Sequence, residues 1–117
     1  MICRLEIAQI TFNNQIETRD GVFLLGNLEE DLLVMNKQTE EVCVYEFDNE
    51  DHLLWQCAES GQSFLHAILI AWKFILARVD SESLWEDESI RALTIDECVK
   101  AAGDTDIYRD FYEMIIG

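Results

Sequence analysis

The sequence of 117 residues contains no proline and only five glycines, and the glycines are not clustered. No stretch therefore has the composition of a flexible linker or of a low-complexity segment. Internal repeats are also missing, and a chain of this length is typical of one domain. We predict a single domain that spans residues 1–117.

The motifs that mark many catalytic sites are missing as well. The sequence has no GxSxG, P-loop, GxGxxG or HExxH motif, and it contains only two histidines, His52 and His66. Neither histidine has the sequence context that would place it in a triad with Ser60. Residues 48–51 are rich in acid, but the glycine and the final glutamate of an EF-hand loop are missing at their required offsets. We predict a protein without enzymatic activity, catalytic residues or cofactor.

Cysteine pairs with short spacing are also missing. The four cysteines are widely separated, at Cys3, Cys43, Cys57 and Cys98. In a cytosolic protein such residues are small apolar side chains with free thiols. The alternative is a zinc site built from two cysteines and two histidines: Cys43, Cys57, His52 and His66. Because the short ligand pairs of zinc sites are absent, we predict no metal site.

The first ten residues lack the uninterrupted apolar region of a secretory signal. Arg4 and Glu6 lie among the apolar residues, and no small-residue cleavage site follows. We therefore expect a cytoplasmic protein.

Basic residues are scarce, and this is the strongest compositional signal. The chain has 24 acidic and 8 basic residues, which gives a net charge of −16. Most of the acid lies in residues 29–60 and 79–117, whereas residues 61–78 carry no acidic residue. Such a surface repels nucleic acid and anionic membranes and attracts basic proteins. The simpler alternative is that the charge only maintains solubility.

One apolar run dominates the middle of the chain. Of the fourteen residues 64–77, only His66 and Lys73 are polar, and on a helix both share a narrow stripe with Leu69 and Leu76. Fourteen helical residues span about 21 Å, short of the ~30 Å core of a bilayer. We predict a helix over residues 61–79 that is buried on most sides. The alternatives are a membrane-associated helix and an interface helix that pairs with a second copy, so we expect a monomer or a homodimer.

The sequence before this helix predicts short strands separated by turns. Alternating or β-branched apolar segments occupy residues 2–12, 21–26, 32–35, 42–47 and 53–57. Turn residues separate them at 13–14, 20–21, 29–31, 36–40 and 48–52. This pattern predicts an antiparallel meander of four to five strands within residues 2–57.

The sequence after residue 79 predicts two to three further helices. Thr94 and Glu97 match a capping box for a helix that ends near Gly103. A last helix, capped by Asp104 or Thr105, has an apolar face formed by Ile107, Tyr108, Phe111, Tyr112 and Ile115. We expect Trp72 and Trp85 in the core. The whole pattern predicts an α+β fold, with the sheet packed on the long buried helix.

Several motifs between residues 21 and 79 occur in an order that resembles one known family. They are Gly26, residues 30–33 (EDLL), 37–40 (KQTE), 42–48 (VCVYEFD), 57–60 (CAES) and 63–65 (SFL). Their order and spacing are similar to the central part of the SUKH superfamily, which includes yeast cell-wall regulators and bacterial immunity proteins. The N-terminal helix with its proline motif, common in that family, has no counterpart in this sequence.

The resemblance implies a SUKH-like binding module without a catalytic centre, one that neutralises a nuclease or deaminase toxin. Physical chemistry supports the same expectation, because toxins that bind nucleic acid have basic grooves and opposite charge speeds association. Candidate contact residues are the acidic residues of the sheet turns and one tryptophan that we expect to be half buried: Glu29, Glu30, Asp31, Glu40, Glu41, Glu46, Asp48, Glu50, Asp51 and Trp55.

Two other functions remain open at this point. Acidic helices over residues 80–97 and 104–113 could mimic DNA, as in inhibitors carried by phages or mobile elements. Alternatively, the stripe containing Leu69 and Leu76 could make the chain a self-associating structural domain of unknown role.

Overall fold

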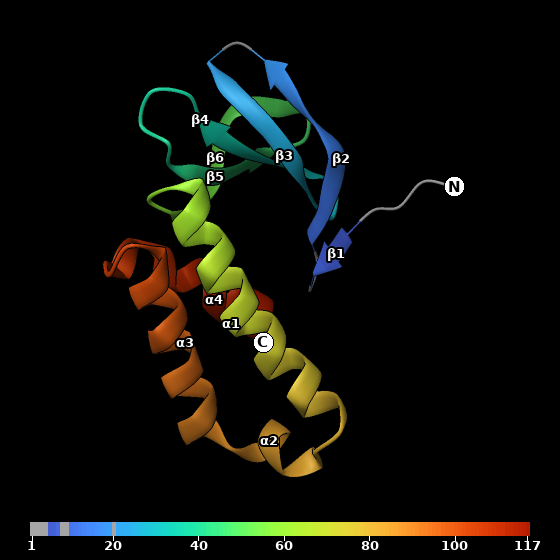
Figure 1. Ribbon diagram of the computed structural model, residues 1–117, viewed down its shortest axis with the longest axis vertical. Helices are drawn as coiled ribbons and strands as arrows, with labels where there is room; N and C mark the ends of the chain where they lie inside the picture. The colour runs from blue at the N-terminus through green and yellow to red at the C-terminus, as the bar shows by residue number, and fades with distance from the viewer. Residues whose placement is uncertain (1–4, 8–9, 20) are drawn as a thin grey trace.

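The computed structural model describes the backbone of residues 5–7, 10–19 and 21–117, and their side chains except those of residues 5–7, 14 and 50 (Figure 1). The strands are β1 (Leu5–Ile7), β2 (Ile10–Arg19), β3 (Val22–Leu28), β4 (Asp31–Asn36), β5 (Val42–Glu46) and β6 (Asn49–Ala58). The helices are α1 (Gly61–Val79), α2 (Glu82–Glu86), α3 (Glu88–Ala102) and α4 (Arg109–Ile116), with a 3-10 turn, η1 (Asp106–Tyr108), before α4. The predicted α+β class, sheet first and helices afterwards, is confirmed.

The six strands form one antiparallel sheet in sequential order, which confirms the predicted meander. The sheet has one strand more than the upper end of the prediction. The predicted turn at Asn13 and Asn14 is wrong, because both residues lie inside β2. The chain passes through this point by a β-bulge, where the pairing with β3 shifts between Phe12 and Glu17. Residues 2–4 and 8–9 of the predicted first strand lie outside the described residues.

Gly26 lets β2 and β3 approach closely at this bulge. It pairs with Phe12, and a Cβ atom at this position would lie 2.1 Å from the backbone oxygen of Thr11. No side chain fits in that distance, so the glycine is required by the packing of two backbones.

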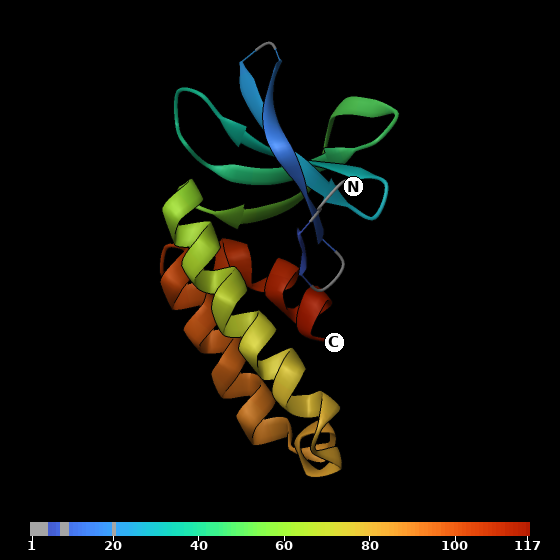
Figure 2. The same ribbon diagram turned by 45° about the vertical axis from the view of Figure 1, so that its right-hand side comes forward.

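Helix α1 has the predicted bounds, and Ser60 caps its start by accepting a hydrogen bond of 3.1 Å from the backbone N–H of Ser63. Burial, however, is confined to one face, formed by Phe64, Ala67, Ile68, Ala71, Phe74 and Arg78. The helix meets the sheet at β6, runs away from it and lies beside α3 (Figures 1 and 2). Among the described residues no element covers the opposite face, so Leu65, Leu69 and Leu76 are exposed.

The length and hydropathy of α1 would also be compatible with a membrane span. Core helices of soluble proteins have the same properties, and one face of α1 packs against α3 and α4.

The predicted start of α3 at Thr94 is wrong. The helix begins at Glu88, where the carboxylate of Asp87 accepts a hydrogen bond of 3.1 Å from the backbone N–H of Ile90. Because this earlier cap is available, Thr94 lies inside the helix, and its hydroxyl donates to the carbonyl oxygen of Ile90. The predicted end is confirmed at Gly103.

The last helix packs between the sheet and α1 through its aromatic residues. Tyr108, Phe111, Tyr112 and Ile115 are buried as predicted, whereas Ile107 is exposed. The Phe111 ring lies 6.4 Å from Trp55 of β6, 6.2 Å from Phe64 of α1 and 5.0 Å from Tyr112, measured between ring centroids. The Tyr112 hydroxyl donates a hydrogen bond of 2.8 Å to the carbonyl oxygen of Cys57. These contacts join β6, α1 and α4.

Trp72 is partly buried, and Trp85 is 58% exposed, so the prediction of a core position is wrong for Trp85. The Trp85 ring instead covers a buried arginine, with the Arg78 guanidinium 4.1 Å from the ring centroid. The indole N–H donates a hydrogen bond of 2.8 Å to the carbonyl oxygen of Arg78. Arg78 also stacks on Phe74 and donates to the carbonyl oxygen of Ile116, so it joins α1, α2 and α4.

We predict that Arg78→Ala lowers the free energy of unfolding by about 3 kcal/mol, because two cation–π contacts and a charge-assisted hydrogen bond are lost. Urea unfolding followed by circular dichroism measures this change. Lys73→Ala, on the exposed face of the same helix, is the control and should change stability by about 0.5 kcal/mol or less. A loss below about 1 kcal/mol for Arg78→Ala would contradict the structural role of this arginine.

Candidate functional site

The structure divides the predicted contact residues between two ends of the sheet. In the antiparallel meander, the β3–β4 and β5–β6 turns lie at one end, on the right of Figure 2, and the β4–β5 turn lies at the other. We call the first group the acidic end: Glu29, Glu30, Asp31, Glu46, Asp48 and Asp51. The side chain of Glu50 lies outside the described residues.

A hydrogen bond joins the two turns of the acidic end. The backbone N–H of Phe47 donates to the carboxylate of Asp31 at 3.1 Å, although the two residues are 16 positions apart. Phe47 itself is 62% exposed. A large apolar side chain therefore lies in solvent on a turn that is fixed to its acidic neighbour.

Among the described residues, the segments that form the acidic end carry almost no compensating positive charge. Glu29, Glu30, Asp48 and Asp51 are exposed, and the other two carboxylates are partly buried. Among the described side chains of residues 29–31 and 46–52, His52 is the only basic group. Its Nδ1 lies 2.7 Å from a carboxylate oxygen of Glu46. Clustered carboxylates of this kind produce a negative potential that attracts basic proteins from a distance.

Glu40 and Glu41 are not brought together with the acidic end. Glu40 lies in the β4–β5 turn with a positive φ of 67°. Glu41 is partly buried and accepts hydrogen bonds of 3.3 Å from the Cys43 thiol and 3.4 Å from the Tyr108 hydroxyl. These contacts show that Glu41 connects the sheet to η1.

Trp55 lies in β6, half buried as predicted, and is separate from the acidic end. It borders a pocket of about 160 Å³ between β6 and the η1–α4 segment. The pocket is lined by Leu53, Leu54, Trp55, Gln56, Ile107, Asp110 and Phe111. We call it the β6–α4 pocket. The sequence did not predict it, because its two walls are about 50 residues apart in the chain.

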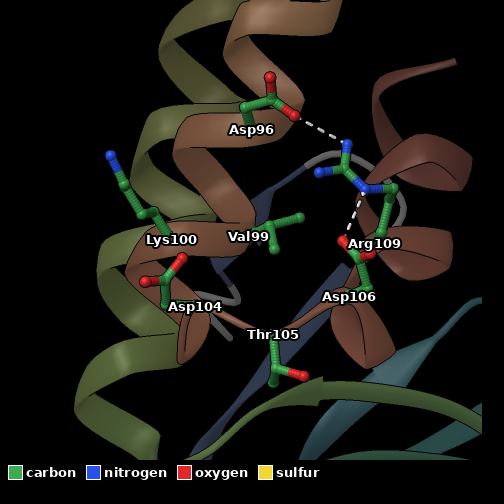
Figure 3. A pocket seen from close by; sticks show the side chains of 7 residues that line it. All are labelled: Asp96, Val99, Lys100, Asp104, Thr105, Asp106 and Arg109. Carbon is green, nitrogen blue, oxygen red and sulfur yellow. Dashed lines mark hydrogen bonds and ion pairs between the residues drawn. The ribbon is translucent and has the colours of Figure 1, made fainter.

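A second, more open pocket of about 370 Å³ lies between α3 and η1 (Figure 3). The Arg109 guanidinium spans its wall, 2.8 Å from the carboxylate of Asp96 and 3.2 Å from that of Asp106. These bonds raise the pKa of Arg109, which keeps the guanidinium charged. A protein that mimics DNA needs a continuous row of carboxylates. Here the Arg109 guanidinium interrupts that row.

The described cysteines are free thiols, as predicted, and Cys3 lies outside the described residues. Burial, together with the hydrogen bond to Glu41, raises the pKa of Cys43 to about 12, and burial raises that of Cys98 to about 12. These thiols are therefore protonated at neutral pH and are poor nucleophiles. Within the described part of the chain, no group of three or more His, Cys, Asp and Glu side chains could hold a metal ion.

Phe47 is the candidate contact residue that sequence reasoning missed. The sequence assigned it to the end of a strand, but β5 ends one residue earlier, at Glu46. The available signal was an aromatic residue directly before the acidic turn at residues 48–51.

No protein-family model matches the chain, and no curated protein or solved structure is significantly similar to it. The SUKH resemblance therefore stays a prediction.

The buried thiols predict a loss of stability at alkaline pH. Thiols in the unfolded chain titrate near 9, whereas Cys43 and Cys98 titrate near 12 in the folded protein. The buried protonated thiols add to the free energy of unfolding, and this contribution is fully present below about pH 9. It decreases as the pH rises toward 12, by about 1.4 kcal/mol per pH unit for each thiol. Urea unfolding at about pH 7, 9 and 11 measures this loss.

Cys98→Ala removes one of these thiols and should make the pH dependence less steep. Equal stability of the wild type at about pH 7 and 11 would contradict the expected contribution of the thiols.

Proposed function

We propose that this protein is a non-enzymatic inhibitor of the immunity type, which neutralises a basic nuclease-like toxin in the cytoplasm. The observation that carries the proposal is the acidic end, where six carboxylates and an exposed phenylalanine lie on or next to two joined turns. The SUKH resemblance of residues 21–79 and the net charge of −16 support the same function.

The proposed mechanism is occlusion of the toxin's nucleic-acid groove. The carboxylates accelerate encounter with a basic groove and then lie opposite its lysine and arginine side chains. Phe47 supplies a desolvated aromatic contact at the centre, the kind of residue that carries much of the affinity in protein interfaces. Inhibition then requires only that the groove is occupied, so this chain needs no catalytic group.

The test is capture of partners from the source lysate, followed by a nuclease assay of the captured protein with and without added inhibitor. The triple variant Glu30→Lys, Asp48→Lys, Asp51→Lys should bind about 100-fold more weakly and should not inhibit. The control is Glu82→Lys, Glu86→Lys, Glu88→Lys, which changes the net charge equally at the far end of the molecule, around α2 (Figure 1). It should keep its affinity within about threefold at physiological salt.

An equal loss of affinity in both triple variants would show that only the total charge matters and would reject the acidic end as the binding site. A captured protein whose nuclease activity is unchanged by the inhibitor would reject toxin neutralisation.

One observation favours a second candidate function, self-association through α1. Leu65 is 51% exposed, Leu69 36% and Leu76 49%, and Trp72 is only partly buried. Their spacing of four, three and four residues is that of a coiled-coil seam. Residues 61–78 contain no carboxylate, so this face is one on which two strongly acidic chains can meet with little local repulsion.

If α1 mediates a homodimer, salt should strengthen it, because salt screens the repulsion between two chains of charge −16. We expect the mass from light scattering to rise from one chain toward two between about 50 mM and 500 mM salt. Leu69→Glu with Leu76→Glu should remain monomeric, whereas Gln38→Glu with Ser89→Glu, which adds the same charge at exposed positions elsewhere, should not. A single-chain mass at all salt concentrations would exclude the dimer.

A further inference from the structure

We infer that the β6–α4 pocket receives an arginine side chain of the basic protein partner. The inference rests on the proposed function for the class of partner, but the pocket itself can be tested without the toxin.

The size of the pocket points to a single side chain. Its volume of about 160 Å³ lies below the range of about 300–1,000 Å³ that is typical of small-molecule sites. Trp55 contributes the aromatic wall, and its ring meets the ring of Phe111 edge to face at a centroid distance of 6.4 Å. Because Phe111 is completely buried, it supports Trp55 from the core and holds that ring in place before any ligand arrives.

Two apolar side chains beside the pocket are left in solvent. Leu53 is 41% exposed and Ile107 is 51% exposed, although Ile107 belongs to an otherwise buried apolar face. A ligand that enters between them would cover both side chains. Their exposure on opposite walls, one on β6 and one on η1, favours an apolar or amphipathic ligand at this position.

The pocket also contains one carboxylate, that of Asp110, in the first turn of α4. Among the described residues, no hydrogen bond or ion pair involves the Asp110 carboxylate. The neighbouring Arg109 does not neutralise it, because that guanidinium is bound to Asp96 and Asp106. Asp110 therefore presents a free negative charge at the edge of a pocket whose other walls include Leu53, Trp55 and Ile107.

Arginine fits this combination better than other side chains. Its methylene stem can cover Leu53 and Ile107, its planar guanidinium stacks on aromatic rings, and its paired N–H groups match a carboxylate. A purely apolar side chain would leave the Asp110 carboxylate partly desolvated and unpaired. Lysine supplies the charge but not the stacking plane.

The pocket and the acidic end are connected by β6. The strand starts at Asn49, beside the acidic end, and reaches the pocket at Leu53. A basic partner bound at the acidic end can therefore continue along β6 and place an arginine next to Trp55. This extends the proposed interface and gives it a specific anchor in addition to general charge.

The test is a titration of the whole protein with the blocked tripeptide acetyl-Gly-Arg-Gly-amide, followed by ¹H–¹⁵N NMR. The signal to follow is the indole N–H of Trp55, assigned with the variant Trp55→Phe. We expect a saturable shift of this signal and of the Ile107 amide at millimolar peptide. Asp110→Asn should weaken binding about tenfold, since a charge-assisted pair is lost. Glu113→Gln, exposed on the same helix but outside the pocket, is the matched control and should bind like the wild type.

The same titration with citrulline in place of arginine should give no saturable shift, because citrulline has a similar shape without the charge. Equal shifts with citrulline, equal binding by Asp110→Asn and Glu113→Gln, or shifts confined to the acidic end would each overturn the inference. The spectrum of each variant shows directly that it is folded. If the peptide binds but no toxin is captured, the pocket stands and the proposed function fails; if the toxin binds but the peptide does not, only the pocket fails.

Discussion

The contacts of Phe111 are the constraint on which the rest of the fold depends. Its ring lies against Trp55 of the sheet, Phe64 of α1 and Tyr112 of its own helix. Helix α1 contacts the sheet at β6 and through the Phe64 ring, which lies 6.3 Å from the ring of Phe12 in β2, and α4 adds its own contacts with β6. A single short helix at the C-terminal end of the chain therefore stabilises the junction between the sheet and the helical layer, and it also forms one wall of the β6–α4 pocket.

Much of the fold could be predicted because local signals coincided with the final contacts. The apolar run and its polar flanks gave the bounds of α1, and the apolar face of the last helix gave most of its buried residues. Predictions failed where a distant contact, or a stronger local one, determined where an element begins or ends. Asp87 provided an earlier cap than Thr94, and a bulge carried β2 through the asparagines at 13 and 14. The sequence could not show that α1 is buried on one face only, because this depends on whether another element packs against its second face.

The candidate site shows the same limit. Acidic turns are visible in the sequence, but their grouping depends on strand order, which places Asp31 beside Phe47 and sends Glu41 to the opposite end. The β6–α4 pocket was beyond sequence analysis, since Trp55 and Asp110 come together only when α4 docks on β6. Charge composition predicted the class of partner, whereas topology decided which carboxylates can act together.

The hydrogen bond between Phe47 and Asp31 also affects the entropy of binding. A hairpin tip normally samples many backbone conformations, and binding that freezes it loses much of the free energy gained from contacts. Here the tip of β5–β6 is fixed to the neighbouring turn through the Asp31 carboxylate. The backbone that carries the aromatic ring is therefore preorganised, and a partner gains the contact with the ring without having to order the loop.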